Sequence, residues 1–142
     1  GSVSGSGNIV GGLIGYSNSP TTNCYATSSV SGVGNNIGGL VGGSSTSLVN
    51  NSFWDITTSN QATSAGGTGL TTSAMQTLST FTDAGWDFQD EYLNGFEDIW
   101  VYYTNNYPRL SWDNSLSPDF TVNQEIITLG TSSQFTNTSK TW

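Results

Sequence analysis

Histidine is absent from this 142-residue chain, and positive charge nearly so, with two Lys or Arg residues against ten Asp or Glu. The missing histidine removes the commonest general base, metal ligand and catalytic-triad partner. Nucleic acid is held by several Lys or Arg side chains that displace counterions, and membrane-surface helices need the same residues. At a formal net charge of −8, we therefore expect no nucleic-acid binding and no membrane-surface helix.

Cysteine and long apolar runs are also scarce. Cys24 is the single cysteine, which excludes an intrachain disulfide framework and a cysteine-based metal site. No window approaches the ~18 consecutive apolar residues of a membrane-spanning helix, so we expect no membrane insertion. The chain starts with Gly1 and carries no charged-then-apolar signal segment, and we expect it to be a mature or excised part of something longer.

What the sequence does contain is an internal repeat. The segment Val3-Ser4-Gly5 returns as Val30-Ser31-Gly32, and the run 9–15 returns as the run 36–42. Both segments are displaced by the same number of positions, so that Val3 corresponds to Val30. Short apolar runs interrupted by a glycine pair indicate strands joined by tight bends, because glycine lets neighbouring backbones approach closely. Repeats of this length are typical of stacked architectures, in which one unit buries its apolar side against the next. We therefore predict an all-β fold with a short β-solenoid, resembling a β-helix, in residues 1–56.

The copies continue with an aromatic residue at the same corner. Tyr25 follows Asn23-Cys24 in the first copy, and Phe53 follows Asn51-Ser52 in the second, one residue later in phase. Stacked copies place equivalent residues on top of each other, and aromatic neighbours on adjacent strands stabilise a sheet. We therefore predict that Tyr25 lies beside Phe53.

Residues 57–117 are predicted to cap the repeats. The stretch 57–71 is polar and Gly-rich and indicates a loop, and Thr72 to Leu78 is the one good helix candidate, with a hydroxyl residue at its start. Aromatic residues concentrate from Phe81 to Trp112, and bulky aromatics suit the atypical unit that closes the end of a repeat stack. Residues 118–142 indicate alternating strands with a Gly turn, the start of a second β domain.

Three stretches carry a family resemblance. Gly11-Gly12-Leu13-Ile14-Gly15 with residues 23–27, and residues 38–42 with 51–55, resemble the GLUG repeat of large bacterial and archaeal surface proteins, including adhesin-like ones. Residues 66–110 look like the segment that commonly follows the last GLUG repeat. Residues 118–139 are similar to the first half of a PKD domain, an extracellular Ig-like sandwich. The resemblance implies a secreted, multidomain protein at the cell surface, and it carries over no catalytic residues.

The acidic residues gather late in the chain. Asp87, Asp90 and Glu91 are candidate calcium ligands, because Ca²⁺ takes six to eight oxygen ligands. No Asp-x-Asp-x-Asp-Gly loop is present, and a solvated acidic face is the alternative interpretation. Paired carboxylates also serve glycoside hydrolysis, but a lyase on a β-helix would want a basic residue beside them. Arg109 is the one candidate, and we expect it to pair with an acid and fix the cap instead. We therefore expect no enzymatic activity and no cofactor apart from this calcium.

Two functions remain open. The first is a non-enzymatic extracellular structural or adhesive module that acts through strand edges and surfaces. Its partners would be copies of itself or adjacent repeats of a longer chain, and such contacts could build a head-to-tail filament or a stalk. The second is a calcium-assisted module that binds surface glycans by stacking exposed aromatic rings on sugars. An ice-binding solenoid ranks behind both, because threonine does not recur in ordered pairs at the offset of the repeat.

Two sets of residues belong to these hypotheses. The candidate glycan-stacking rings are Trp86, Trp100, Tyr102 and Trp112. Burial inside the cap is the alternative for these rings, since clustered aromatics are usually buried. The sequons at Asn50 and Asn137 are candidate glycosylation sites in a secreted protein.

Overall fold

The computed structural model describes residues 1–45, 48–113, 120–122 and 135–137. They belong to two compact units, Gly1–Ser111 and Trp112–Trp142. Strands dominate the described residues and the helices are short, so the prediction of a mostly β chain is confirmed. The predicted boundary after residue 56 falls inside the first unit, and the predicted boundary at residues 117–118 lies outside the described residues.

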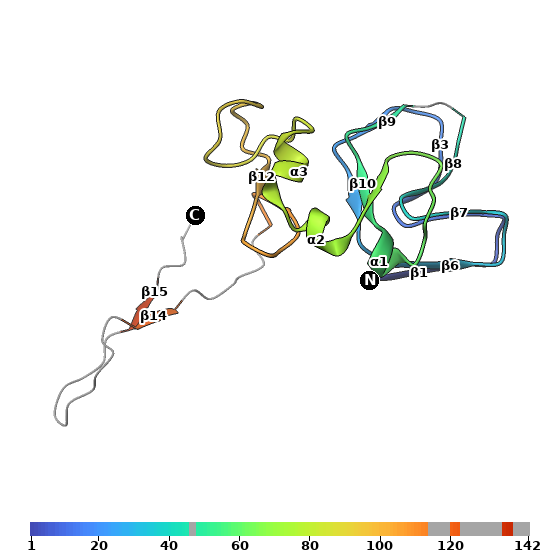
Figure 1. Cartoon of the computed structure of the whole chain (residues 1–142), viewed down its shortest axis with the longest axis horizontal. Helices are drawn as coiled ribbons and strands as arrows, with labels where there is room; N and C mark the ends of the chain where they lie inside the picture. The colour runs from blue at the N-terminus through green and yellow to red at the C-terminus, as the bar shows by residue number, and fades with distance from the viewer. Residues whose placement is uncertain (46–47, 114–119, 123–134, 138–142) are drawn as a thin grey trace, which may run out of the picture. The chain divides into compact units, whose positions relative to one another are not determined.

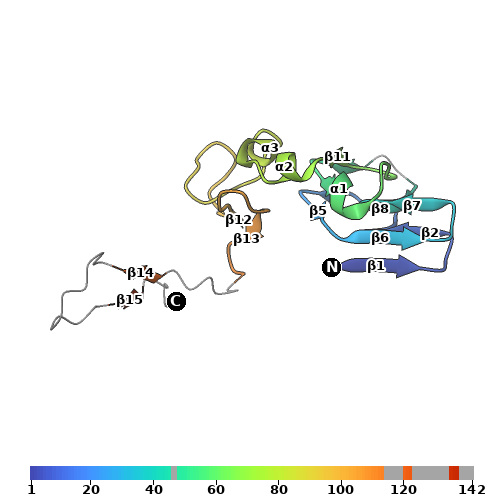
Figure 2. The same ribbon diagram turned by 60° about the horizontal axis from the view of Figure 1, so that its bottom comes forward.

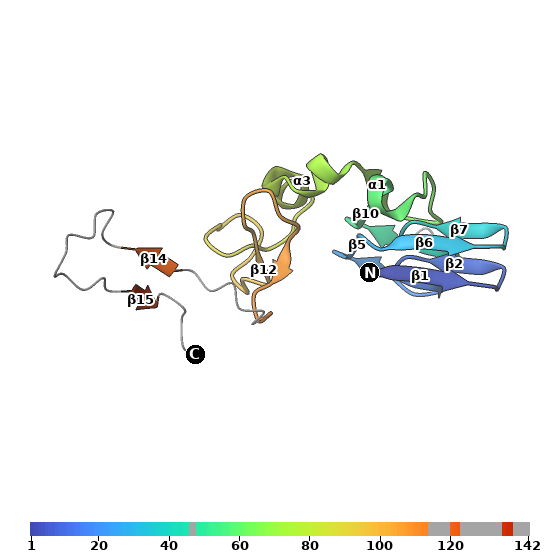
Figure 3. The ribbon, with the colours of Figure 1, turned by 90° about the horizontal axis from the view of Figure 1, so that it is seen from below.

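Ten short strands build the first half of the first unit. They are β1 (Ser2–Gly5), β2 (Ile9–Gly11), β3 (Ile14–Ser17), β4 (Thr21–Thr22), β5 (Tyr25–Ala26), β6 (Ser29–Gly32), β7 (Asn36–Gly38), β8 (Val41–Ser44), β9 (Val49–Asn50) and β10 (Phe53–Asp55). Strands β1 to β5 form the first layer, residues 2–26, and β6 to β10 form the second layer, residues 29–55. Figure 1 looks along the stack, so that β1 nearly overlaps β6, and Figure 3 shows the two layers from the side.

Each strand of the first layer pairs in parallel with its counterpart in the second. Val3 lies beside Val30, its equivalent in the repeat. Tyr25 lies beside Phe53, one residue later in phase, and the predicted placement of these two aromatics is confirmed. The second layer contains one extra residue between β8 and β9. Strands β3 and β8 still pair at the spacing of the repeat, as in Ile14 with Val41, whereas β4 and β9 pair one residue further along, as in Thr21 with Val49.

The repeated glycine pair lets the chain bend sharply inside each layer. A Cβ atom on the first glycine of a pair, Gly11 or Gly38, would overlap the carbonyl oxygen three residues later. A Cβ on Gly12 would overlap the carbonyl oxygen of Gly39 in the second layer, and a Cβ on Gly39 would overlap the indole of Trp54. These positions admit no side chain, which explains why the pair recurs with the repeat. Apolar side chains fill the remaining interior, and the buried ones cluster as Ala26, Leu40, Val41 and Trp54.

The segment after β10 covers the second layer on the side away from the first (Figure 2). Helix α1 (Ile56–Ser59) begins there, and β11 (Thr68–Leu70) pairs in parallel with β10. Between them, the backbone N–H of Gly39 donates to the carbonyl oxygen of Thr63 at 3.0 Å, and that of Ala65 donates to Val41 at 2.9 Å. The stretch 57–71, predicted to be a loop, therefore contains most of a helix and a strand.

Residues 72–111 complete the first unit and are called the aromatic region below. They contain helices α2 (Thr72–Met75) and α3 (Leu78–Thr82), and β12 (Trp100–Val101), which pairs antiparallel with β13 (Arg109–Leu110). The helix predicted over residues 72–78 begins as predicted but ends at Met75 as α2, and Leu78 begins α3. The Thr71 side chain accepts a hydrogen bond from the backbone N–H of Ala74.

This region packs against two aromatic rings of the layers, Tyr25 and Phe53. The buried members of its core are Phe53, Met75, Phe81, Trp86 and Phe88, with Tyr25 packed against them. Tyr25 and Phe53 belong to the ends of the layers at β5 and β10, so the aromatic region sits beside the stack, as Figure 1 shows. The prediction that these aromatics close the end of the stack is therefore wrong in location. Residues 60–70 lie over part of that end, with hydrogen bonds to Gly39, Val41 and Ser52, and β11 pairs with β10.

In the second unit, β14 (Phe120–Val122) pairs antiparallel with β15 (Phe135–Asn137). This pairing agrees with the prediction of alternating strands after Pro118. The remainder of that prediction lies outside the described residues.

Candidate functional site

The first layer has a partner on one side only. Among the described residues, each of β1 to β4 pairs with a single strand, its counterpart in the second layer. Along a parallel strand, backbone groups point alternately to the two neighbouring strands, so half of the groups on this edge point away from the second layer. This surface of β1 to β4, together with the side chains of the first layer beside it, is the open face.

Equivalent residues of the two layers differ in burial. Leu13 is 48% exposed, whereas Leu40, its counterpart in the repeat, is 0% exposed. Val3 is half-buried, whereas Val30 is buried. The residue types are the same, so the difference comes from position. Residues 60–70 hydrogen-bond to Gly39 and Val41, on either side of Leu40, whereas no described strand pairs with the other side of the first layer. Leu13, whose counterpart belongs to the core, is therefore exposed at the open face, whereas Val10 of the same layer is buried.

The open face also lacks the usual protection of strand edges. Exposed edge strands normally carry Lys, proline or inward-pointing charges, which prevent pairing with another chain. No charged side chain occurs before Asp55 in this sequence, and β1 to β4 contain no proline. The open face therefore presents unpaired strand edges without these protecting features.

Asp55 joins the second layer to the aromatic region. Its side chain is fully buried; Oδ1 accepts hydrogen bonds from the backbone N–H groups of Thr57 and Thr58 at 2.7 and 3.1 Å, which starts α1. The hydroxyl of Tyr107 donates to Oδ2 at 2.7 Å. Burial raises the pKa of Asp55, but the hydrogen bonds from Thr72, Tyr107 and the two backbone groups outweigh it and hold the pKa below 3.8. Burial, with the adjacent carboxylate, raises the pKa of Tyr107 to about 12.

These shifts predict a pH dependence of stability. The lowered pKa of Asp55 adds stability that is present above its ordinary pKa of 3.8 and is lost as the pH falls through the lower folded value. The raised pKa of Tyr107 adds stability that is present below its ordinary pKa of 10.0 and is lost as the pH rises through about 12. We expect Asp55→Asn to flatten the acid limb, and Tyr107→Phe the alkaline limb, of urea-unfolding midpoints measured against pH.

Asp90→Asn provides the matched control, because Asp90 is exposed. Its acid limb should follow that of the unmodified chain. An Asp55→Asn variant with the same acid limb as the control would contradict this assignment.

The candidate calcium ligands have different surroundings. Asp87 is 7% exposed, and its Oδ2 accepts a hydrogen bond from the backbone N–H of Glu97 at 2.9 Å. The Glu91 carboxylate accepts from two backbone N–H groups of its own loop, and Asp90 is exposed. Within the part of the chain that the structure describes, no three His, Cys, Asp or Glu side chains are placed to hold a metal ion. The three carboxylates are therefore not gathered at one point in the described structure, and calcium binding by them stays a prediction.

Trp86 is part of the core. It is 0% exposed, its ring centroid lies 4.8 Å from that of Phe81 and 4.5 Å from that of Trp100, and its Nε1 donates to the carbonyl oxygen of Asn51 at 2.8 Å. No face of this indole is left for a sugar, so the glycan-stacking prediction is wrong for Trp86.

The other three candidate rings share no common setting. Trp100 and Tyr102 are half-buried, and the Tyr102 hydroxyl donates to the carbonyl oxygen of Gln76 at 2.6 Å. Trp112 is 66% exposed and belongs to the second unit. Of the sequon residues, Asn50 is exposed in β9 and Asn137 lies in β15, and their glycosylation stays a prediction.

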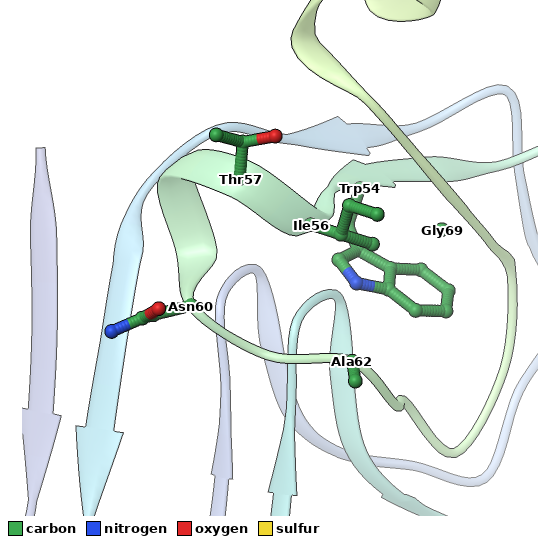
Figure 4. A pocket seen from close by; sticks show the side chains of 6 residues that line it. All are labelled: Trp54, Ile56, Thr57, Asn60, Ala62 and Gly69. Atoms are coloured by element: carbon green, nitrogen blue, oxygen red, sulfur yellow. The ribbon is translucent and has the colours of Figure 1, made fainter.

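A shallow hollow of about 510 Å³ lies on the covered end of the stack (Figure 4). Its lining residues are Trp54, Ile56, Thr57, Asn60, Ala62 and Gly69. Trp54 is 6% exposed, and its Nε1 donates to the carbonyl oxygen of Gln61 at 2.9 Å. The lining carries no charge and few polar groups, so the hollow offers little to orient a ligand.

Comparisons with known proteins give one relative to describe. No family model matches the chain, and no solved structure matches it. The chain is similar to a protein of Evansella cellulosilytica named "Putative Gly-rich membrane protein", with 38% identity over 108 residues. The match covers 72% of this chain and 12% of that protein, so the chain spans a small part of its relative's length. No helix among the described residues is long and apolar enough to span a membrane.

Proposed function

We propose that residues 1–56 form a short β-solenoid of the GLUG type, and that the chain is a non-enzymatic structural or adhesive module of a cell-surface protein. The parallel pairing of the two layers, repeat position on repeat position, supports the solenoid. The glycine pairs that admit no side chain support it as well. The name of the longer relative, a membrane protein, supports a place in the cell envelope. The β14–β15 pair agrees with the PKD-like character of residues 118–139.

The exposure of Leu13 beside the burial of Leu40 carries the functional proposal. The layers stack by translation along the repeat, so the open face of the first layer has the residue pattern that the second layer presents to the first. A further layer of the same pattern would therefore fit the open face in parallel register. Neighbouring repeats of a solenoid stabilise each other through such interfaces. The partner of this face is then an adjacent repeat, contributed by a longer chain or by another copy.

The covered end bears on how copies would assemble. Residues 60–70 lie over part of the second layer and share hydrogen bonds with Gly39, Val41 and Ser52, so a further layer stacked there would have to displace them. Strands β6 to β9 nevertheless pair with one strand each among the described residues, as β1 to β4 do. A head-to-tail filament needs two complementary edges, whereas two copies that meet through the same face close into a dimer. We therefore place repeat-on-repeat stacking within a longer stalk ahead of a filament made of single copies.

Adding a repeat tests the proposal. A chain with a second copy of the segment 1–27 placed before Gly1 should be more stable by about 2 kcal/mol or more, because the half-exposed apolar side chains of the first layer become buried. The denaturant dependence of the free energy of unfolding should also rise, since more surface is buried in the folded state. Urea unfolding followed by far-UV circular dichroism measures both quantities.

The control carries the same added segment in shuffled order. It adds equal length and composition without the repeat pattern, and its unfolding midpoint should match that of the unmodified chain. Equal stability of the two lengthened chains would contradict a stacking role for the open face.

A further inference from the structure

A second exposed surface lies in the loop formed by residues 89–98, on the aromatic region. Tyr92 is 80% exposed, Leu93 is 94% exposed and Phe96 is 83% exposed. Nearby Phe81 and Trp86 are fully buried, so the region does bury its large side chains where it can. Three large apolar side chains so close together in the chain are costly to leave in water, and such patches mark interaction sites. These three residues are the apolar tip.

The loop that carries the apolar tip is fixed by side chains bonded to backbone. The Glu91 carboxylate accepts hydrogen bonds from the backbone N–H groups of Leu93 and Asn94 at 2.9 and 3.2 Å. The side-chain amide of Asn94 donates to the carbonyl oxygens of Thr82 and Trp86 at 2.9 and 3.4 Å. The turn that presents Tyr92 and Leu93 is therefore tied to α3 and to the buried core.

Asp87 fixes the other end of the tip. Its buried carboxylate accepts the hydrogen bond from the backbone of Glu97, directly after Phe96. Gly95 has a φ of +147°, and a Cβ at this position would overlap the same carboxylate. A loop that is already held in one conformation loses little conformational entropy when it binds. The apolar side chains are thus presented on a prepared backbone.

The charges around the tip define its partner. Four carboxylates flank it, at Asp90, Glu91, Glu97 and Asp98, and no Lys or Arg occurs in the chain before Arg109. An anionic lipid surface or an acidic polysaccharide would be repelled by this rim. Protein interfaces commonly combine an apolar centre with a charged rim of complementary sign. The match to this surface is an apolar recess surrounded by Lys or Arg.

We propose that residues 89–98 are a docking loop for a partner protein that offers an apolar recess rimmed by basic side chains. This role is separate from stacking at the open face. The open face has no charge and binds strands, whereas the docking loop binds through apolar side chains and carboxylates together.

A synthetic peptide of alternating Lys and Leu residues is the probe, immobilised and titrated with the full chain. We expect binding that weakens as salt is added, because three of the rim carboxylates, Asp90, Glu97 and Asp98, are exposed. Two further peptides, one with Glu in place of Lys and one with Ser in place of Leu, should bind at least about tenfold more weakly, since each lacks half of the proposed chemistry. Equal binding of all three peptides would overturn the proposal, as would no binding of the first.

Chain variants locate the binding. The triple variant Tyr92→Ser, Leu93→Ser, Phe96→Ser should raise the dissociation constant at least about tenfold and keep the far-UV spectrum, because the three side chains are exposed. The matched control is Val33→Ser, which removes an 84% exposed apolar side chain from the layers and should bind as the unmodified chain does.

A charge variant separates the two parts of the surface. Asp90→Asn with Glu97→Gln leaves the apolar tip intact and should weaken binding while reducing its dependence on salt. Unchanged affinity in the triple variant, or equal loss in Val33→Ser, would overturn the docking loop and leave the stacking proposal untouched.

Discussion

Replacing Gly38 with alanine should lower the free energy of unfolding by about 3 kcal/mol or more, enough to leave much of the chain unfolded. The new Cβ would overlap the carbonyl oxygen of Val41, and it would lie 3.1 Å from the Cα of Ser64, so backbone rather than a flexible side chain would have to move. The strain falls where β7 turns into β8, in the layer that has neighbours on both sides. Urea unfolding followed by far-UV circular dichroism measures the change.

Gly15→Ala is the control within the same repeat motif. Its Cβ would meet only the carbonyl oxygen of Ile9, at an ordinary 3.9 Å. We expect an unfolding midpoint close to that of the unmodified chain. If the free energy of unfolding fell by comparable amounts in Gly15→Ala and Gly38→Ala, the close approach of backbone at Gly38 would not explain the need for glycine.

Replacing Trp86 with alanine should cost about 3 to 5 kcal/mol, the range for removing a large buried aromatic. The indole contacts the rings of Phe81 and Trp100, and its loss also leaves the carbonyl oxygen of Asn51 without its donor. The aromatic region should then separate from the layers, with loss of the near-UV circular dichroism signal before the far-UV signal. Trp86→Phe should cost less, because it keeps a ring and loses the hydrogen bond.

Trp112→Ala removes the same side chain from an exposed position. At 66% exposure, its loss should change the free energy of unfolding by less than about 0.5 kcal/mol. If the two tryptophan variants were equally stable, the burial of Trp86 in the core would be refuted.

The register of the layers could be predicted from sequence because the repeat is nearly exact where backbone approaches backbone. The glycine pairs at residues 11–12 and 38–39 occupy equivalent bends, and identical neighbours such as Val3 and Val30 pair directly. The aromatic corner could be predicted in the same way, since Tyr25 and Phe53 follow similar short segments. Local pattern and global fold agree in this half of the first unit.

The fate of individual side chains after residue 55 could not be predicted, because it depends on distant partners. Helix α1 has the sequence Ile-Thr-Thr-Ser, which favours helix weakly, and it starts because Asp55 caps it and is itself held by Tyr107 from the far end of the unit. Trp86 is buried because Asn51 and the ring of Phe53 lie against it. The aromatic residues of this region follow no periodic pattern in the sequence. The sequence therefore does not distinguish the buried Trp86 from the exposed Tyr92.

The open face itself could be anticipated only in part. The shortness of the repeat pointed to an uncovered layer, but which end is covered follows from residues 60–70, whose hydrogen bonds to Gly39 and Val41 have no signature in the sequence. The spacing of Asp87, Asp90 and Glu91 indicated a shared ion. Their carboxylates are instead divided between backbone and solvent, which spacing alone does not reveal.

The absence of charge before Asp55 has a consequence for the environments in which the layers hold together. With no ionic side chain in residues 1–54, their stacking has no ion pairs for salt to screen, and no side chain there titrates between about pH 4 and pH 8. Every carboxylate side chain comes later, in Asp55 and the regions that follow. High salt or mild acid should therefore leave the repeat stack intact while weakening any binding by the proposed docking loop, so that the two parts of the chain would respond to different features of the surroundings.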